Sequence, residues 1–360
     1  MNYPMSQILE AFGRGEIVVV TDDKDREGEG DLVIAAVLCN AEKMAFIIRH
    51  TSGIVCAPIT IETARRLRLD PMVSCNDSNY ATAFTVSIDY KPDNGTGISA
   101  DERASCCRAL ANPNASPNDF ARPGHVFPLI ARDGGVLFRS GHTEAAIDLC
   151  RLSNTIPVGI ISELVNDDGT VMKGGQVERF AAKHGLKEVS IDELIAYRQA
   201  RETLIERFAT FATESPIGVL EGYAYRSPFD SIAHIAFVHN GVGDGTNVLT
   251  RFHKPNIIED IFAGPRTMES VLAHFRRAGN GVLVCLRDGA AGVPVSPITE
   301  PHTVEADRNR QWREVGVGAQ ILRDLGVTSI RHLTSTHHDY MGLSGFGIEI
   351  ASIENLTDAR

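Results

Sequence analysis

The sequence is short of several features that mark particular classes of protein. Among its 360 residues there is one tryptophan, aromatic residues make up 6%, and no apolar run approaches the length of a membrane span. The net charge of −11 counts against binding to nucleic acids or anionic membranes, which needs a basic surface. Residues 1–16 also lack a basic leader before an apolar core. We therefore expect a cytoplasmic protein whose substrates are small molecules.

Disulfides and the fingerprints of common enzyme classes are missing as well. The seven cysteines are odd in number and form no CxxC pair, which is typical of reduced thiols in the cytoplasm. There is no GxGxxG dinucleotide loop, GxxxxGK[ST] phosphate loop, GxSxG elbow or HExxH zinc pair. Any chemistry must therefore rest on other combinations of residues.

The length suits two domains, because single cores stop growing beyond about 250–300 residues. Up to residue 200 helical and strand-like patterns alternate, which predicts an α/β or mixed α+β domain. The strand-like segments are 17–20, 32–38, 54–59, 84–88, 125–131 and 158–165. The helical segments are 8–13, 41–49, 61–68, one opened by the capping pair Ser99 and Glu102, and one that begins near His142.

A different pattern follows in the second half. Residues 190–212 are predicted to form one long amphipathic helix, after which Pro216 begins a strand-rich stretch to about residue 253. The apolar side of this helix holds Ile191, Leu194, Ile195, Leu204, Ile205 and Phe208. The later elements are helices at 267–278 and 314–325 and strands at 282–286 and 328–334. We place the boundary near 205–215 and divide the chain into domains 1–207 and 208–360.

Six carboxylates are crowded into residues 22–31, between two apolar runs. Every second residue from Asp23 to Asp31 is acidic, so an extended backbone would direct these side chains to one side, while Gly28 lets a ligand approach the main chain. This pattern suits a divalent cation or a polyol, and a solvated acidic loop is the alternative. We do not expect an EF-hand, because Ile34 stands where its last ligand, a glutamate, is required.

Three further segments carry chemistry. His125 follows a rigid proline-glycine turn, where a lone histidine is more often structural than catalytic. The segment 139–144 is a glycine turn entering a helix, which either binds a phosphate through backbone N–H groups or is an ordinary capped helix start. Glu163 lies in an otherwise apolar strand, where a carboxylate must be paired, bound to a ligand or protonated. It is therefore a candidate acid or base.

Together these segments closely resemble the 3,4-dihydroxy-2-butanone 4-phosphate synthase family of riboflavin biosynthesis. The matching segments follow the family's order, and they are 22–31, 96–100, 122–125, 139–145 and Glu163. The family often has asparagine at Gly28, a change that adds backbone freedom without removing a ligand. The resemblance implies an α/β (α+β) domain with a mixed sheet and surrounding helices. It also implies a homodimer whose active sites are completed across the subunit interface.

The resemblance further implies a lyase that converts D-ribulose 5-phosphate to L-3,4-dihydroxy-2-butanone 4-phosphate and formate with Mg²⁺ or Mn²⁺. Glu27 and His142 would hold the metal, and His125 and Glu163 would be essential for proton transfer. The residues that would meet the substrate are Arg26, Glu27, Asp31, Thr96, Arg139, Ser140, Gly141, His142, Thr143 and Glu163.

The C-terminal half resembles GTP cyclohydrolase II in segments 316–326 and 343–350, which implies a second α+β domain of that fold. That enzyme needs three cysteines to hold zinc, but residues 206–360 contain only Cys285. Asn256 stands in the place of the first zinc cysteine. We therefore expect no zinc in this half.

Another departure from the family lies beside its catalytic arginine, which matches Arg313. Gln311 stands where the family has the partner aspartate, so a base is lost and no cyclohydrolase activity is expected. Two alternatives stay open: a bifunctional enzyme, or a C-terminal half that serves in assembly or nucleotide sensing. The histidines of this half are interpreted as isolated surface residues rather than metal ligands, and they include His302, His332, His337 and His338.

Overall fold

The computed structural model divides into two compact units, Met1–Tyr197 and Arg198–Arg360. The structure describes residues 3–22, 28–78, 82–93, 95–203, 205–226, 233–255, 266–287, 316–334, 343 and 347–356. Within these ranges no helix combines the length and the apolar character needed to span a bilayer.

A seven-stranded mixed sheet forms the centre of unit 1, with the strand order β4-β5-β3-β6-β2-β1-β7. The strands are β1 (Val18–Thr21), β2 (Gly30–Ala35), β3 (Cys56–Ile59), β4 (Ile88–Tyr90), β5 (Phe120–Ile130), β6 (Gly159–Glu163) and β7 (Lys187–Ser190). Strand β2 runs antiparallel to β1 and β6, whereas β3 pairs with β5, and β1 with β7, in parallel. The mixed sheet expected for this domain is confirmed.

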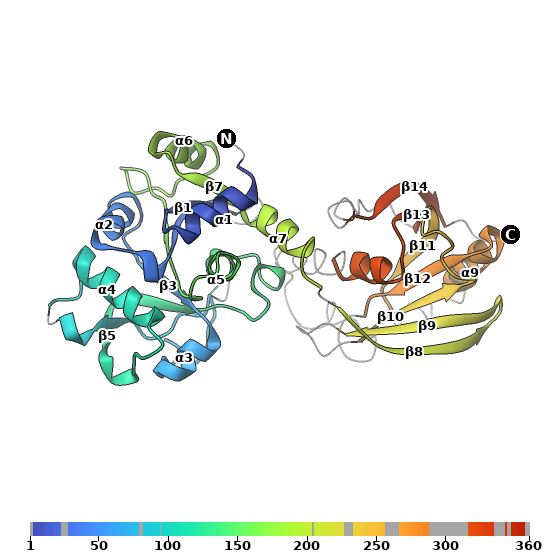
Figure 1. Ribbon diagram of the computed structural model, residues 1–360, viewed down its shortest axis with the longest axis horizontal. Helices are drawn as coiled ribbons and strands as arrows, with labels where there is room; N and C mark the ends of the chain where they lie inside the picture. The colour runs from blue at the N-terminus through green and yellow to red at the C-terminus, as the bar shows by residue number, and fades with distance from the viewer. Residues whose placement is uncertain are drawn as a thin grey trace. The chain divides into compact units, whose positions relative to one another are not determined.

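Helices surround this sheet (Figure 1). They are α1 (Met5–Gly13), α2 (Ala41–His50), α3 (Ile61–Leu67), α4 (Ala100–Ala111), α5 (His142–Leu152), α6 (Gly175–His184) and α7 (Ile191–Gln199). Helix α5 packs directly on β6, because a Cβ at Gly159 would lie 2.8 Å from the Cβ of Ala146. The predicted capping box is present at α4, where the Ser99 hydroxyl accepts from the Glu102 N–H and the Glu102 carboxylate from the Ser99 N–H.

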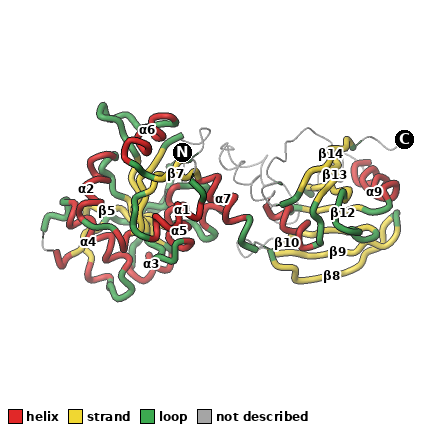
Figure 2. The backbone as a smooth tube through the Cα atoms, turned by 45° about the horizontal axis from the view of Figure 1, so that its top comes forward, coloured by secondary structure: helices red, strands yellow, loops and turns green. Residues whose placement is uncertain are grey.

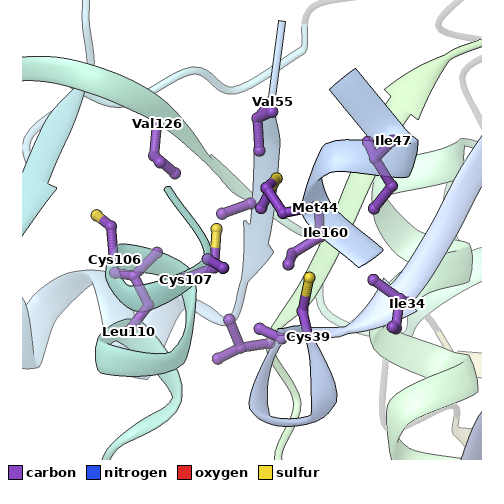
Figure 3. Packing of buried hydrophobic residues seen from close by; sticks show 14 of the residues in the cluster. Ile34, Cys39, Met44, Ile47, Val55, Cys106, Cys107, Leu110, Val126 and Ile160 are labelled. Carbon is purple, nitrogen blue, oxygen red and sulfur yellow. The ribbon is translucent and has the colours of Figure 1, made fainter. Parts of the chain in front are cut away.

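The main core of unit 1 lies between the sheet and helices α2 and α4 (Figure 3). Met44 and Ile47 from α2 and Cys106 and Cys107 from α4 belong to one buried cluster, together with strand residues such as Ile160. All seven cysteines are free, and four are buried. Most of the cysteines are therefore small core residues, as free cysteines usually are.

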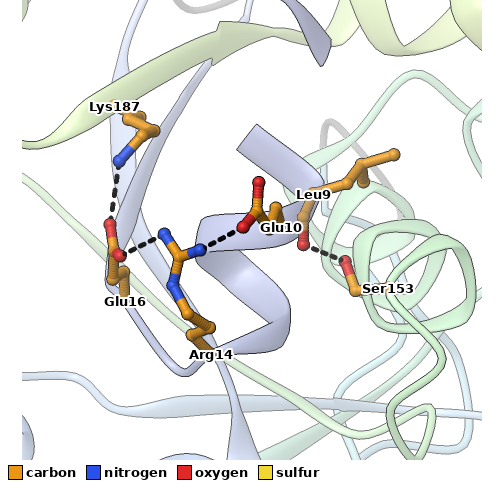
Figure 4. Close-up of polar contacts among 6 residues, drawn as sticks. All are labelled: Leu9, Glu10, Arg14, Glu16, Ser153 and Lys187. Carbon is orange, nitrogen blue, oxygen red and sulfur yellow. Dashed lines mark hydrogen bonds and ion pairs between the residues drawn. The ribbon is translucent and has the colours of Figure 1, made fainter. Parts of the chain in front are cut away.

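Polar contacts attach α1 to its neighbours (Figure 4). The Ser153 hydroxyl, just after α5, donates to the Leu9 carbonyl at 3.0 Å. Glu16 binds Lys187 of β7 at 2.8 Å and Arg14 at 2.9 Å. Arg14 and Glu16 are exposed, so their ion pair adds little to stability.

Unit 2 is built on a second seven-stranded sheet, with the strand order β14-β13-β11-β12-β10-β9-β8. The strands are β8 (Glu206–Ser215), β9 (Gly218–Arg226), β10 (Ala233–His239), β11 (Val248–His253), β12 (Gly281–Cys285), β13 (Ser329–Thr334) and β14 (Glu349–Asn355). Helical segment 316–324 packs apolar residues into one core cluster. Helix α9 (Arg266–Ala278) contributes Val271, Leu272 and Phe275 to another.

The long helix predicted for residues 190–212 is wrong in its second half. Helix α7 ends at Gln199, and the chain continues as strand β8, which pairs with β9 (Figure 2). Residues of β8 such as Phe208 and Thr210 favour strands, and the Ser215–Gly218 turn holds β8 in register with β9. Phe208 is therefore exposed on a strand, not buried on a helix. Strand β14 was not predicted, and the strand expected at 32–38 ends at Ala35 in a 3-10 turn.

Candidate active site

A cavity of about 160 Å³ opens in unit 1 beside the start of α5. Asp31 comes to it from β2, Glu163 from β6, and Arg139, His142 and Thr143 from the turn into α5. Five residues that were predicted from the sequence, and that come from three separate segments of it, therefore line one space. Among the predicted residues of this turn, Ser140 and Gly141 do not line the cavity.

Three ionisable groups converge in this cavity. Asp31 and Glu163 are direct partners in the antiparallel pairing of β2 with β6. The His142 Nδ1 lies 4.0 Å from the Asp31 Oδ1. Asp31 is 3% exposed and His142 is 8% exposed, so their interaction is only weakly screened by water.

Glu163 lies at the exposed end of β6. Partial loss of solvent raises the pKa of its carboxyl, and the negative charge of Glu29 raises it further. A hydrogen bond from the Ser52 side chain opposes this shift. The Ser52 backbone N–H also donates to the Glu163 carbonyl at 2.9 Å, so this segment supports the end of β6. A carboxyl with a raised pKa holds its proton more readily, which suits it to act as an acid as well as a base.

The turn into α5 has the features of an anion site. Gly141 is the N-cap residue, and the positive end of the helix dipole begins at His142. Arg139 and Thr143 line the cavity at this helix end, and the Thr143 side chain is largely buried. Backbone N–H groups, a guanidinium and a hydroxyl in this arrangement are suited to bind a phosphate.

His125 and Thr96 lie elsewhere on unit 1. His125 is on β5, four residues and therefore about 13 Å from the cavity residue Leu129. Its Nδ1 is 2.8 Å from one oxygen of Asp89, whose other oxygen accepts the His125 backbone N–H at 2.8 Å. Thr96 is exposed, and its neighbour Gly97 packs against the same carboxylate. Within its own chain this cluster does not line the cavity.

Asp89 was missed by sequence reasoning. It is one acid in a short strand, and only its alternation with the buried Ile88 hinted that it leaves the core.

The predicted residues Arg26 and Glu27 lie outside the described residues, but the two ends of the acidic run are described. The Asp22 carboxylate accepts the Glu29 N–H at 2.8 Å, and the Glu29 carboxylate lies 3.2 Å from the Lys173 Nζ. These two acids close the base of the loop next to Asp31. Asp22 and Glu29 therefore bind groups of the protein itself, so the acids of this run do not all have the same role.

The donors at the cavity suit a hard divalent cation in part. Within the described residues, no three His, Cys, Asp or Glu side chains gather as a complete metal site. Asp31, His142 and Glu163 nevertheless offer carboxylate oxygens and an imidazole nitrogen to one cavity. Mg²⁺ usually takes one or two carboxylates and keeps several waters, so these residues would supply part of a site for it.

Cys56 also lines the cavity, and sequence reasoning gave it no role. Burial raises the pKa of its thiol far above the ordinary value, and the carboxylates of Asp31 and Glu163 add to this shift. The thiol therefore stays protonated and is a poor nucleophile. It belongs with the apolar wall formed by Ile54, Phe84 and Leu129.

A larger hollow of about 610 Å³ lies between the α1–β1 turn, α2 and the α6–β7 turn. Its lining residues Arg14 and Glu16 bind each other, and no predicted site residue faces it. The smaller cavity is therefore the better candidate, because the predicted site residues line it and not the larger hollow.

In unit 2 most of the predicted positions, including Asn256, Gln311, Arg313, His302, His337 and His338, lie outside the described residues. His332 is described, and its interpretation as a surface histidine is wrong. It is 2% exposed on β13, its ring packs at 5.8 Å against Phe252, and burial followed by the charge of Arg251 lowers its pKa to about 4.

Comparison with known proteins identifies two family models in the chain. The 3,4-dihydroxy-2-butanone 4-phosphate synthase model matches residues 6–197, and the GTP cyclohydrolase II model matches residues 206–355. The riboflavin biosynthesis protein RibBA of Salinispora arenicola is 42% identical over 96% of this chain and 87% of its own length. The monofunctional riboflavin biosynthesis protein RIBA 2 of Arabidopsis thaliana is 40% identical over 96% of this chain and 75% of its own length.

Solved structures agree with these matches. RibBX, a two-domain 3,4-dihydroxy-2-butanone 4-phosphate synthase from A. baumannii, aligns with a TM-score of 0.79 at 34% identity, covering 98% of this chain and 99% of RibBX. A 3,4-dihydroxy-2-butanone 4-phosphate synthase in complex with two magnesium ions aligns with a TM-score of 0.54 at 44% identity, covering 56% of this chain and 98% of that one.

Proposed function

The chain belongs to the 3,4-dihydroxy-2-butanone 4-phosphate synthase family, and from this premise we propose that its cavity converts D-ribulose 5-phosphate to L-3,4-dihydroxy-2-butanone 4-phosphate and formate with the help of a divalent metal. It is an enzyme of riboflavin biosynthesis with a second domain of the GTP cyclohydrolase II family. The observation that carries the proposal is the convergence of Asp31, His142 and Glu163 beside the phosphate-type turn of α5.

In the proposed binding mode the phosphate lies at the start of α5. Arg139 and Thr143 supply a cation and a hydroxyl, and the backbone of Ser140 and Gly141 supplies N–H groups. The sugar oxygens then reach Asp31 and Glu163, with Arg26 and Glu27 of the acidic loop as further partners. The five carbons of the substrate become four plus one, and hydrogen and oxygen also balance, so no oxidant or second substrate is required.

Glu27 and His142 would hold the metal, Mg²⁺ or Mn²⁺. When bound, it would hold substrate oxygens and stabilise the negative charge of an enediolate. The similar synthase solved with two magnesium ions supports a hard divalent cation. The protein's own part is to move protons, and Glu163, with its raised pKa, is placed to exchange one with a substrate carbon or hydroxyl.

We also propose that the enzyme is a homodimer. His125 is exposed and held firmly by Asp89, yet it lies outside the cavity of its own chain. A second copy that brings its His125 and Thr96 to this cavity would complete the site. In this arrangement His125 is the second proton-transfer group.

The C-terminal domain is proposed to lack GTP cyclohydrolase II activity and to bind no zinc. Residues 206–360 contain only Cys285, so three cysteine ligands are not available. RibBX, a similar protein described as a two-domain 3,4-dihydroxy-2-butanone 4-phosphate synthase, supports this proposal. The alternatives are a bifunctional enzyme, as RIBA 1 of Arabidopsis thaliana is described, and a module for assembly or nucleotide sensing.

The decisive test is formate release from D-ribulose 5-phosphate by the full chain with Mg²⁺. We expect activity that EDTA abolishes and added Mg²⁺ or Mn²⁺ restores. A folded, metal-supplied protein that releases no formate would contradict the proposal.

A further inference from the structure

Glu144 is a charged side chain that the structure keeps almost entirely from water. It lies on α5, two residues after His142, and is 1% exposed. Its Oε2 lies 2.7 Å from the Arg139 Nη1, and its Oε1 accepts the backbone N–H of Arg132 at 2.9 Å. Burying a carboxylate costs several kcal/mol, which only good ionic and hydrogen-bonded partners offset.

A second buried carboxylate lies one turn further along α5. Asp148 is 1% exposed, and its Oδ2 accepts the Val136 N–H at 2.8 Å. Gly135 has a φ of 63°, and a Cβ there would lie 2.2 Å from the Asp148 Oδ1. Glu144 and Asp148 thus attach segment 132–139 to α5 at two points.

The glycine turn is shaped around the ion pair. A Cβ at Gly141 would lie 2.3 Å from the Arg139 Nη1 and 2.9 Å from the Glu144 Oε2. Gly141 has an extended φ of −116°, which any residue adopts, so its backbone conformation does not explain the glycine. A glycine suits this position because a larger residue would take the space of the Arg139 guanidinium and the Glu144 carboxylate.

This pair determines where the Arg139 guanidinium lies. One of its edges binds Glu144, and its Nη2 is 3.4 Å from the hydroxyl of Thr82, a residue that lines the cavity. The arginine side chain is flexible and loses rotamer entropy when it is held in one place. Glu144 provides that restraint before the substrate arrives.

We propose that Glu144 is a positioning residue for phosphate recognition: it holds the guanidinium of Arg139 toward the cavity so that the phosphate of the substrate meets a preorganised cation. The inference rests on the proposed function, in which Arg139 binds that phosphate. Charge repulsion alone would give the opposite result, because a nearby carboxylate repels a phosphate.

The two views predict opposite signs for Glu144→Gln. The substitution keeps the size of the side chain and removes its charge. If electrostatic repulsion dominates, KM for D-ribulose 5-phosphate falls. If positioning dominates, KM rises by about tenfold while kcat changes less than about threefold, because a charge-assisted hydrogen bond contributes about 1.5 kcal/mol or more.

A double-substitution cycle separates positioning from a merely structural role. We expect Arg139→Ala to raise KM by about a hundredfold or less, and Glu144→Gln to add nothing in that background, because its target is gone. Asp148→Asn is the matched control, a buried carboxylate on the same helix that accepts the Val136 N–H. It should lower the unfolding temperature as much as Glu144→Gln does, with KM within about twofold of the parent.

Each outcome decides between the inference and its premise. An Arg139→Ala enzyme with the parent's KM overturns the proposed phosphate site and the inference together. A raised KM in Arg139→Ala, with an unchanged or lowered KM in Glu144→Gln or with additive effects, overturns only the inference. Should Glu144→Gln not fold, Glu144→Asp keeps the charge and shortens the reach, and an unchanged KM in that folded variant overturns the inference equally.

Discussion

Asp31 on β2 and Glu163 on β6 face each other directly across an antiparallel strand pair. Their Cβ atoms are therefore about 4.5–5.5 Å apart, and like charges in such a position destabilise a sheet. The pair lines the candidate active site together with His142. The fold tolerates this repulsion where a cation or substrate hydroxyls would relieve it.

Glu163→Gln is expected to abolish formate release without weakening the fold. Loss of a proton-transfer group lowers kcat by about 10²–10⁴-fold. The pKa of Glu163 is raised in the folded state, so the unfolded state loses its proton at lower pH, and stability falls as pH rises through this window. The variant avoids that loss, and thermal unfolding at pH 8 should show it at least as stable as the parent.

The same comparison at pH 4 is the control for this prediction. Just below the ordinary carboxyl pKa both states hold most of the proton, so the two unfolding temperatures should differ less than at pH 8. A variant that is clearly less stable at pH 8 would mean that the carboxylate has a structural role.

His142→Ala is expected to remove metal binding. Its imidazole lies in the cavity beside Asp31, and no other described histidine lines that cavity. Titration of the metal-free protein with Mn²⁺, followed by electron paramagnetic resonance, should show tight binding in the parent and at least tenfold weaker binding in the variant. His50→Gln, at a histidine of unit 1 outside the cavity, is the control and should bind like the parent; equal loss in both would point away from His142.

Two inactive variants are expected to restore each other if active sites are shared between subunits. His125→Ala and His142→Ala alter different parts of the same proposed site. Random reassociation gives about half mixed dimers, each with one intact site, so formate release should return to about a quarter of the parent rate. Activity that stays absent in verified mixed dimers would place both residues in one chain's site or outside catalysis.

The C-terminal domain is expected to have no GTP cyclohydrolase II activity. The full chain should release no pyrophosphate from GTP, and elemental analysis should find less than one zinc per chain, because the cysteine ligands are missing. A known bifunctional relative is the positive control in the same assay. Stoichiometric zinc with pyrophosphate release would instead favour the bifunctional alternative.

Acid is expected to destabilise unit 2 through His332. Its folded pKa is about 4 against an ordinary 6.5, so between these values the unfolded chain takes up a proton that the folded chain does not. Stability therefore falls as pH drops through this window. Urea unfolding at pH 5 and pH 7.5 should differ less in His332→Gln than in the parent, and an equal difference in both proteins would exclude His332 as the cause.

Much of the architecture follows from local patterns. The capping pair Ser99 and Glu102 predicted the start of α4, and alternating or continuous apolar runs predicted strands close to β1, β3 and β6. The helix predicted through residues 200–212 is wrong because the apolar spacing fits a helix, whereas the Phe and Thr residues pair with β9 in a strand. The spacing of apolar residues indicates which of them are buried. Whether the backbone is a helix or a strand also depends on a partner strand with which it can pair.

The sequence by itself determined the family, the two domains and the chemical types of the site residues, because these depend on short motifs and on composition. Only the tertiary structure brought Asp31, His142 and Glu163 to one cavity. It also placed His125 beside Asp89, outside that cavity, and buried Glu144 against Arg139. These relationships join distant parts of the chain through strand register and helix packing. No local pattern specifies such distances, because they are set by the whole sheet and the helices packed on it.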